Sequence, residues 1–300
     1  SYKNVVTQLE LEEKLRDNKL NDVNNIVMIQ CVGAREKERN YCSKICCAEA
    51  IKNAIMIKQR NPDANVLICY TDIMTQGKGY EQLRSEALKL GLSEVKYSKN
   101  KPIEIKESNG KISVKFFTPS LKRSIEVEAD LVVLSTPLVP QNDAVQLSQL
   151  LKVPLDQHGF FLEAHTKLRP LDFSNEGIFL CGCAHSPKDI SESIAQGNGA
   201  AGRACMILSK KEIEIESYTA FVDASICIGC GECAKACYFK AIELKEVRPN
   251  LPKAEVNEMA CKGCGACVPA CPAGAISQKG FETKQIRAMY KAILGEAEID

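Results

Sequence analysis

Cysteine is the residue type in this chain whose number and spacing could support chemistry. The 300 residues include 16 cysteines, and twelve of them fall into three groups. No segment near Ser1 resembles a signal peptide, so we expect a reducing, cytoplasmic setting, in which clustered cysteines indicate metal binding rather than secreted disulfides. Four cysteines lie outside the groups, namely Cys69, Cys181, Cys183 and Cys205. We expect Cys181 and Cys205 to be packing residues.

Two of the groups share the spacing C-x2-C-x2-C-x3-C. In two-cluster ferredoxins the first three cysteines of such a run bind one cluster, and the fourth binds the other cluster. The alternative is zinc, whose sites usually take four ligands in two pairs rather than two interlocked sets. We therefore predict two 4Fe–4S centres, one bound by Cys227, Cys230, Cys233 and Cys271, the other by Cys261, Cys264, Cys267 and Cys237.

Composition excludes several classes of protein. The 39 basic and 38 acidic residues give a net charge of +1, which is not the broad basic field of a dedicated nucleic-acid binder. No apolar run approaches the roughly 20 residues that a membrane helix needs, so we expect no membrane span. The length suggests about two domains.

Hydrophobic patterning predicts an α/β fold with parallel strands, because buried apolar runs alternate with amphipathic helices. A change to alternating apolar and polar residues predicts antiparallel strands joined by a hairpin turn at 108–110. The expected helices are 1–20, 46–60, 80–90, one through Ala200 and Ala204, and 283–294. The expected strands are 25–30, 66–70, 101–106, 111–117, 124–128, 130–134 and 177–180.

The third cysteine group lies where a nucleotide-binding α/β domain would place its glycine-rich phosphate loop. Here the loop has a single glycine, Gly33, so we expect that no nicotinamide nucleotide binds at this loop. The residues alone leave three interpretations open, namely a cluster, paired redox thiols or buried cysteines. The members of this group are Cys31, Cys42, Cys46 and Cys47.

Two stretches carry a specific resemblance: Gln30-Cys31-Val32-Gly33-Ala34-Arg35 and Tyr41-Cys42-Ser43-Lys44-Ile45-Cys46-Cys47. They resemble the HdrA-like family, the A-type iron–sulfur flavoprotein subunits of heterodisulfide reductase, and residues 218–280 resemble the bacterial-type ferredoxin domain. The first resemblance implies that the four N-terminal cysteines hold a third 4Fe–4S cluster beside a flavin. It also implies that Lys52 lies at the flavin's redox-active edge, although a solvated helix lysine is the alternative on sequence alone.

The segment from Asn175 to Cys183 resembles the closing part of thioredoxin-reductase-like flavoproteins, in which a strand is followed by a helix N-terminus, here expected at about 194–199, that faces the flavin. A plain strand–loop–helix is the alternative. The G-x-G-x-x-G half of a flavoprotein is missing, so either the chain is a fragment or another polypeptide completes the FAD site. The predicted flavin contacts are Gly182, Cys183, Ile194, Ala195, Gln196 and Gly197.

These features predict an incomplete thioredoxin-reductase-like (Rossmann-type) flavoprotein domain at 1–215, with a nicotinamide-domain-like part at about 20–135 and a flavin-domain part at about 136–210. A two-cluster ferredoxin domain follows at 216–282, and a helix and tail at 283–300. The resemblance implies an oxidoreductase component that passes electrons between FAD and clusters, with bifurcation or confurcation. It also implies activity only with partners, namely heterodisulfide-reductase B/C-like subunits, a hydrogenase or dehydrogenase donor, and ferredoxin.

Three alternatives remain at this point. The chain could be a non-catalytic iron–sulfur electron wire without a flavin of its own. It could belong to a quinone-linked or aromatic-acid-linked relative of the same family. A nicotinamide-dependent reductase is the third, and the single-glycine loop argues against it.

Overall fold

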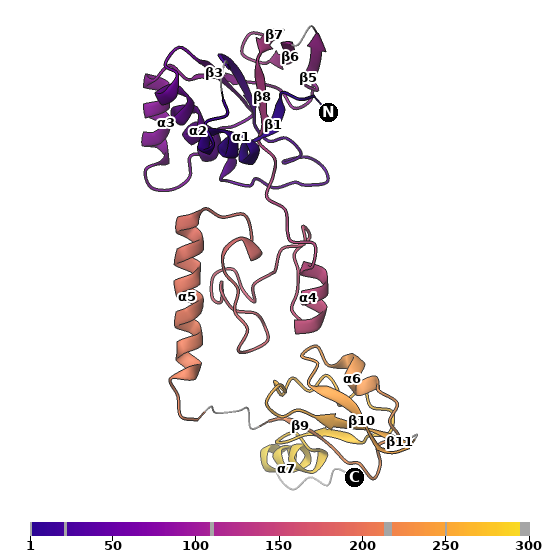
Figure 1. Ribbon diagram of the computed structural model, residues 1–300. Coiled ribbons are helices and arrows are strands. Elements are labelled where there is room, and N and C mark those ends of the chain that lie inside the picture. Colours follow the sequence, from indigo (N-terminus) through magenta and orange to yellow (C-terminus); the bar gives the residue numbers. More distant parts are fainter. Residues whose placement is uncertain (1, 21–22, 109–110, 213–217, 250, 295–300) are drawn as a thin grey trace. The chain divides into compact units, whose positions relative to one another are not determined.

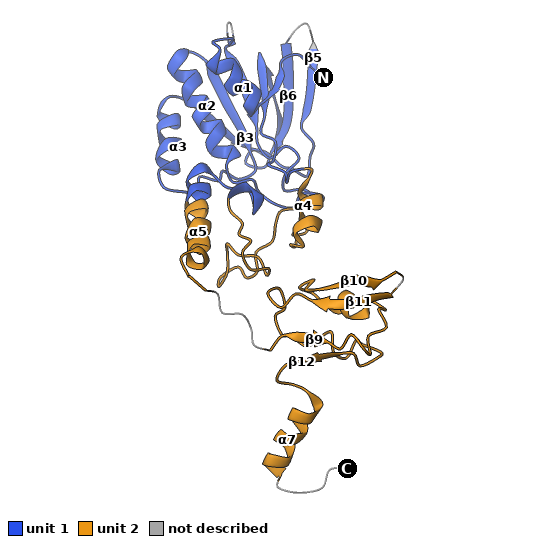
Figure 2. Cartoon of the chain, turned by 60° about the horizontal axis from the view of Figure 1, so that its bottom comes forward, with its two compact units in different colours: residues 1–141, 182–194 blue, residues 142–181, 195–300 orange. Residues whose placement is uncertain are grey.

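The computed structural model describes residues 2–20, 23–108, 111–212, 218–249 and 251–294. The chain forms two compact units, which Figure 2 shows in different colours. Unit 1 contains residues 1–141 and 182–194, and unit 2 contains residues 142–181 and 195–300. The predicted boundary at 215/216 lies outside the described residues, so the predicted domain limits stay predictions.

Unit 1 is built on a five-stranded sheet in the order β1-β8-β2-β3-β4, in which all neighbouring strands are parallel. The continuous apolar runs predicted this arrangement, because strands covered on both faces have no solvent side. The predicted α/β class is confirmed. The strands are β1 (Val5–Thr7), β2 (Asn25–Ile29), β3 (Asn65–Tyr70), β4 (Ser93–Lys96) and β8 (Leu131–Leu134).

Each face of this sheet is covered by a different layer (Figure 1). Helices α1 (Gln8–Arg16), α2 (Cys46–Arg60) and α3 (Tyr80–Lys89) pack on one face through a large aliphatic cluster. An antiparallel sheet of β5 (Glu104–Ser108), β6 (Lys111–Thr118) and β7 (Arg123–Ala129) packs on the other face through a second cluster. Alternation within β2 serves both layers, since Ile26 and Met28 face the helices while Val27 and Ile29 face the antiparallel sheet.

The N-terminal segment and the predicted hairpin turn of unit 1 differ from expectation. The expected helix over residues 1–20 is wrong, because β1 pairs with β8 and α1 begins only at Gln8. Thr7 and Glu10 form a capping box that fixes this start, with both the Thr7 side chain and its backbone N–H engaged. The expected turn residues Asn109 and Gly110 lie outside the described residues.

The segment from 142 to 208 contains α4 (Ala144–Leu151), the short 3₁₀ helix η1 (Gly182–Ala184) and α5 (Ile190–Leu208). The strand expected at 177–180 is wrong, because in the described residues this stretch forms a single bridge, between Asp172 and Phe179. A strand needs a neighbour to accept its hydrogen bonds, and one bridge does not make a ladder. Residues 194–199 were also expected to open a helix, but α5 begins at Ile190, so they lie inside it.

The C-terminal part of unit 2 consists of two similar halves offset by 34 residues, as Cys227 and Cys261 show. Strand β9 (Ala220–Val222) of the first half pairs with β12 (Ile276–Gln278) of the second. Strand β10 (Ile242–Arg248) pairs with β11 (Leu251–Val256) in the same register, because Val222 opposite Ile276 corresponds to Val256 opposite Ile242. The halves are therefore related by an approximate two-fold arrangement and share one small core.

Two helices complete this part of the chain. Helix α6 (Glu232–Ala236) follows the first cysteine loop, and α7 (Thr283–Leu294) matches the predicted terminal helix. Among the described residues, no helix is both long enough and apolar enough to cross a bilayer.

Candidate metal centres

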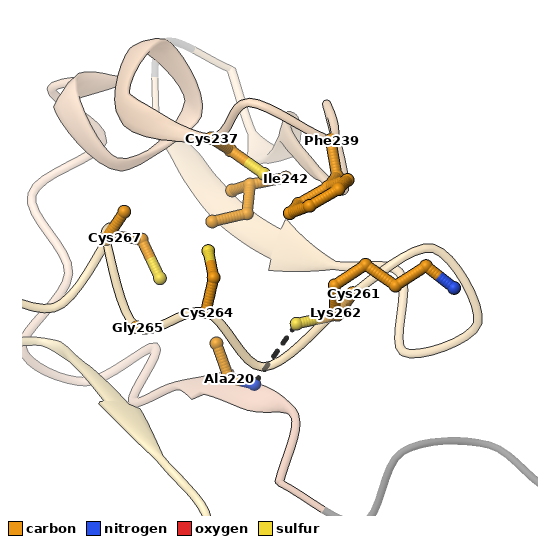
Figure 3. A pocket seen from close by; sticks show the side chains of 10 residues that line it. Ala220, Cys237, Phe239, Ile242, Cys261, Lys262, Cys264, Gly265 and Cys267 are labelled. Atoms are coloured by element: carbon orange, nitrogen blue, oxygen red, sulfur yellow. Dashed lines mark hydrogen bonds between the residues drawn. The ribbon is translucent and has the colours of Figure 1, made fainter. Parts of the chain in front are cut away.

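The second ferredoxin-type site is the clearest of the three cysteine sites (Figure 3). Cys261, Cys264 and Cys267 line one cavity together with Cys237, which comes from the end of α6 in the other half. Figure 3 shows the four side chains directed toward the same space. Among the described residues no three potential ligands converge on a point where one ion would bind. Four thiols around a cavity suit a cluster, in which each thiolate binds its own iron.

The first ferredoxin-type site repeats this pattern. Cys233 lies within electrostatic reach of Cys227 in its own run and of Cys271 in the other run. Burial raises the pKa of the Cys233 thiol, and it raises the pKa of Cys267 to about 11 in the second site. Buried thiols of this kind become favourable thiolates only when a metal supplies the compensating charge.

Backbone N–H groups donate to the fourth cysteine of each run, Cys237 and Cys271. We call these the crossing cysteines, because each is predicted to bind the cluster of the other run. The amide of Ala241 donates to Cys237 Sγ at 3.3 Å, and the amide of Ala275 donates to Cys271 Sγ at 3.3 Å. Burial acts to raise the pKa of Cys271, but the backbone donors around it outweigh that effect and lower it. Such N–H···S bonds stabilise a thiolate ligand and tune cluster potential, so the residues present fit the group.

Two glycines in the cysteine loops are required by close backbone approach. Gly229 and Gly263 have φ of +72° and +60°. A Cβ on Gly229 would lie 2.2 Å from the Pro252 carbonyl oxygen, and one on Gly263 would lie 2.7 Å from that of Tyr218. The loops can therefore approach the backbone of Pro252 and Tyr218 this closely only where they carry no side chain.

The N-terminal cysteines gather at the carboxyl edge of the parallel sheet in unit 1. Cys31 follows β2 with a left-handed φ of +61°, and Thr71 and Asp72 follow β3. Thr71 Oγ1 lies 3.5 Å from Cys31 Sγ, and the Asp72 carbonyl lies 3.9 Å from Cys47 Sγ. The sequence expectation that this edge carries a site thus agrees with the general position of ligands in parallel α/β sheets.

The four N-terminal thiols lie within electrostatic reach of one another. A hydrogen bond from Cys46 to Cys47 raises the pKa of Cys46 and lowers the pKa of Cys47 to about 7. The charges of Cys31 and Cys42 also act on Cys46, and burial raises the pKa of Cys31. All four predicted ligands are therefore brought together from a stretch that has no regular secondary structure between Cys31 and Cys46.

Two further observations test whether this site suits a cluster. Helix α2 starts at Cys46 with no side-chain cap, which leaves the positive end of a 15-residue helix at the thiols. The Gln30 side chain, directly before Cys31, is fully buried, and neither of its amide atoms has a hydrogen-bond partner in the described structure. Both features fit a bound group that is anionic and rich in hydrogen-bond acceptors. Sequence reasoning missed Gln30, although a polar residue ending an apolar run was the available signal.

Lys52 lines a cavity of about 380 Å³ in unit 1, within the size range of small-molecule sites. Its ammonium is ion-paired with Glu12 on α1, and it is about half-exposed, at 45%. Lys44 and Ile45, which lie between Cys42 and Cys46, form part of the same wall. This cavity is therefore backed by the segment that carries the N-terminal cysteines.

The other predicted flavin contacts do not line this cavity. Gly182 and Cys183 lie in η1, where Cys183 is exposed and its Sγ lies 3.5 Å from the Lys188 carbonyl. The remaining four lie inside α5: Ile194, Ala195, Gln196 and Gly197. Their assignment to a flavin stays a prediction.

Of the four cysteines outside the groups, only Cys69 is buried. The expectation that Cys181 and Cys205 are packing residues is wrong, because both are exposed. Cys205 lies on α5, none of whose residues is buried, so helical apolar spacing there did not signal a core position.

Comparison with known proteins bears on these sites. Residues 226–275 match the family model described as a 4Fe-4S dicluster domain. The chain is 40% identical to an A-type iron-sulfur subunit of the CoB–CoM heterodisulfide reductase of Methanopyrus kandleri, over 99% of this chain and 47% of the relative. It is 39% identical to the corresponding A-type subunit of the H(2):CoB-CoM heterodisulfide,ferredoxin reductase of Methanothermobacter thermautotrophicus, over 98% of this chain and 46% of the relative.

A solved structure of thioredoxin reductase from T. acidophilum is similar with a TM-score of 0.45 at 17% identity, over 69% of this chain and 59% of that one. The chain spans about half the length of the curated relatives it matches. The dicluster match covers all eight cysteines of the two ferredoxin-type runs. The resemblance stated from the cysteine motifs is therefore confirmed, and the chain is a homologue of part of the A-type iron–sulfur subunits of heterodisulfide reductase.

Proposed function

We propose that the chain is the electron-transfer part of a heterodisulfide-reductase-type oxidoreductase. It would carry two ferredoxin-type clusters and a third cluster at Cys31, Cys42, Cys46 and Cys47. The observation that carries the proposal is the grouping of thiols, since residues far apart in sequence, Cys237 with Cys261–Cys267 above all, line one cavity. The names of the relatives, which belong to heterodisulfide reductases, support the reaction class.

The cavity at Lys52 is the proposed site of the flavin ring. A bound flavin can exchange two electrons at once with a substrate and one electron at a time with clusters. Lys52 would place a cation beside the ring and stabilise added negative charge, while Lys44 and Ile45 would separate the ring from the cysteine site by one layer of chain. Residues outside this chain would complete the FAD site, either the rest of a longer protein or a separate polypeptide.

Partner subunits belong to the same proposal. Electrons would leave through the ferredoxin-type sites, in which Cys230 and Cys264 are exposed. The proposed recipients and donors are heterodisulfide-reductase B/C-like subunits, a hydrogenase or dehydrogenase, and ferredoxin. Two acceptors appear in the name of the Methanothermobacter relative, a heterodisulfide and ferredoxin, and this supports bifurcation as the finer form of the proposal.

Iron and flavin quantification on anaerobically purified protein, with its partners, tests the proposal most directly. We expect twelve irons per chain, four for each cluster. A count of eight irons would contradict the proposed N-terminal cluster. Iron without any flavin would favour the second candidate, an electron-transfer subunit without its own flavin. The structure offers that candidate one point of support, because Lys52 is neutralised by Glu12.

Lys52 and Glu12 provide a matched pair of variants for the flavin site. Lys52→Ala removes the cation and should lower the flavin midpoint potential, whereas Glu12→Gln releases the same cation from its ion pair and should raise it. Potentiometric titration of the flavin absorbance measures both. Equal potentials in the wild type and both variants would show that Lys52 is an ordinary surface lysine.

A further inference from the structure

Gln30 is the least satisfied polar side chain in the described structure. It is 0% exposed, and neither Oε1 nor Nε2 has a hydrogen-bond partner. Its backbone is fully engaged, since the N–H donates to the Cys69 carbonyl and the Gln30 carbonyl accepts from the Tyr97 hydroxyl at 2.8 Å. Burying an amide without partners is costly, so a native protein rarely leaves one in place without a reason.

The strand pattern tells which way this amide faces. Ile26 and Met28 belong to the cluster that packs against α1 and α2, and Gln30 is the next residue in the same alternation. The first turn of α2 contains Cys46 and Cys47, both buried, and Cys31 directly follows Gln30. The alternation assigns the Gln30 amide to the helix side of the sheet, the side on which α2 begins with Cys46 and Cys47.

We propose that the Gln30 side-chain amide donates a hydrogen bond to a sulfur of the group held by the four N-terminal cysteines. This inference rests on the proposed cluster at that site. An NH₂ group has two donors, and cluster sulfides and cysteine sulfurs are hydrogen-bond acceptors. The Thr71 hydroxyl already lies 3.5 Å from one of these sulfurs, Cys31 Sγ. A donor bond to sulfur stabilises the more negative, reduced state, so Gln30 raises the potential of this cluster.

An enclosed water is the competing explanation. Asn53 on α2 also has a buried Oδ1 without a partner, while its Nδ2 donates to Gln8 at 2.9 Å. An enclosed water hydrogen-bonded to the Gln30 amide would satisfy it and leave the cluster untouched. The two explanations differ in whether the spectroscopic properties of the cluster depend on Gln30.

The experiment compares Gln30→Met, which keeps the length of the side chain and removes its donors, with wild type in the full chain. EPR-monitored redox titration follows the three clusters separately. We expect the ratio of reduced to oxidised N-terminal cluster at a fixed potential to fall about fivefold, which corresponds to ~1 kcal/mol. The two ferredoxin-type clusters should titrate as in wild type.

Thr118→Val is the matched control, because Thr118 Oγ1 is another buried polar atom without a partner, on β6 in the antiparallel layer. It should leave all three clusters unchanged. Unchanged titration in Gln30→Met, with twelve irons retained, overturns the inference in favour of the enclosed water. Eight irons in the wild type would instead overturn the proposed cluster itself, so the two failures are distinguishable.

A measurement on the wild type covers the case in which Gln30→Met does not assemble its cluster. Glutamine labelled with ¹⁵N at the side-chain amide should give a nitrogen coupling in pulsed EPR of the reduced N-terminal cluster. The same labelling in Thr118→Val should give the same coupling. Absence of any coupled amide nitrogen in both proteins overturns the inference.

Discussion

The two cysteine regions of this molecule differ in what holds the polypeptide around them. In the ferredoxin-type part, the buried cluster of side chains includes Cys227, Cys233, Cys237 and Cys267 themselves, with mostly small neighbours such as alanine. In unit 1, the N-terminal cysteines lie at the edge of a sheet that is covered on both faces by large aliphatic side chains. The cysteines are the core in one region and an addition to a core in the other.

This difference predicts different dependence on iron. A small domain whose core is made of cluster ligands gains its folding free energy from the metal, whereas a sheet with two aliphatic layers has its own. The same reasoning explains the exposed cysteines, since Cys230 and Cys264 lie on loops that a cluster would fix in place. The two regions should therefore respond differently when iron, a ligand or a loop glycine is removed.

Chelation of iron should have the largest effect. Removing all iron anaerobically should unfold residues 218–281 and leave the parallel sheet of unit 1 folded, because only the former depends on clusters for its core. Hydrogen exchange read by mass spectrometry should show loss of protection in β9–β12 and retained protection in β2, β3 and β8. Uniform loss in both regions would contradict the contrast.

Removal of a crossing cysteine should cost one whole cluster in the opposite half. Cys237→Ser should abolish the cluster of the Cys261 run, whose cavity Cys237 lines, and Cys271→Ser should abolish that of the Cys227 run. Iron should fall from about twelve to about eight per chain in each variant, with different EPR signals lost. If both variants lose the cluster of their own run instead, the interlocked assignment is wrong.

Alanine at the loop glycines should destabilise the ferredoxin-type part by a smaller amount. Gly229→Ala forces a Cβ to 2.2 Å from the Pro252 carbonyl oxygen and holds alanine at a positive φ, at a cost of roughly 1–3 kcal/mol or more. The measurement is the guanidinium midpoint at which cluster absorbance bleaches anaerobically.

Gly274→Ala is the control for this variant. Its φ is +61°, but no atom lies within 4 Å of the added Cβ, and the corresponding residue in the other half, Lys240, adopts φ +52° with a side chain. Gly274→Ala should therefore shift the bleaching midpoint less than Gly229→Ala. Equal shifts in the two variants would mean that backbone conformation, and not the approach to Pro252, decides the cost.

The same contrast explains what the sequence could predict. Cysteine spacing predicts the two ferredoxin-type ligand sets because each loop is local and repeated, and that assignment stays a prediction. Apolar runs identified β2, β3 and β8 because those strands are buried on both faces. Strand β1 was missed because its three residues are specified by pairing with β8 more than a hundred residues away. The strand expected at 177–180 was wrong because its local apolar pattern does not show whether a neighbouring strand is present to pair with it, and the described residues form only a single bridge there.

The two halves of the ferredoxin-type part also differ in charge, and this predicts the smallest effect. Lys253 is half-buried and its ammonium donates to the backbone carbonyl of Cys227, whereas the equivalent residue in the other half is the neutral, buried Thr219. The cation near the second site, Lys262, is instead paired with Glu176 at 2.7 Å. A cation beside a cluster stabilises its reduced state, so Lys253 should raise the potential of the Cys227 site.

Lys253→Met should therefore lower the midpoint potential of that cluster alone. An interaction of about 1 kcal/mol corresponds to roughly 40 mV for one electron. Lys245→Met is the matched control, because Lys245 lies on the paired strand of the same hairpin, is 61% exposed and is neutralised by Glu255. EPR-monitored titration compares the two. Equal shifts would attribute the effect to net charge, whereas a shift confined to Lys253→Met would show that the repeat sets different potentials at its two sites through one side chain.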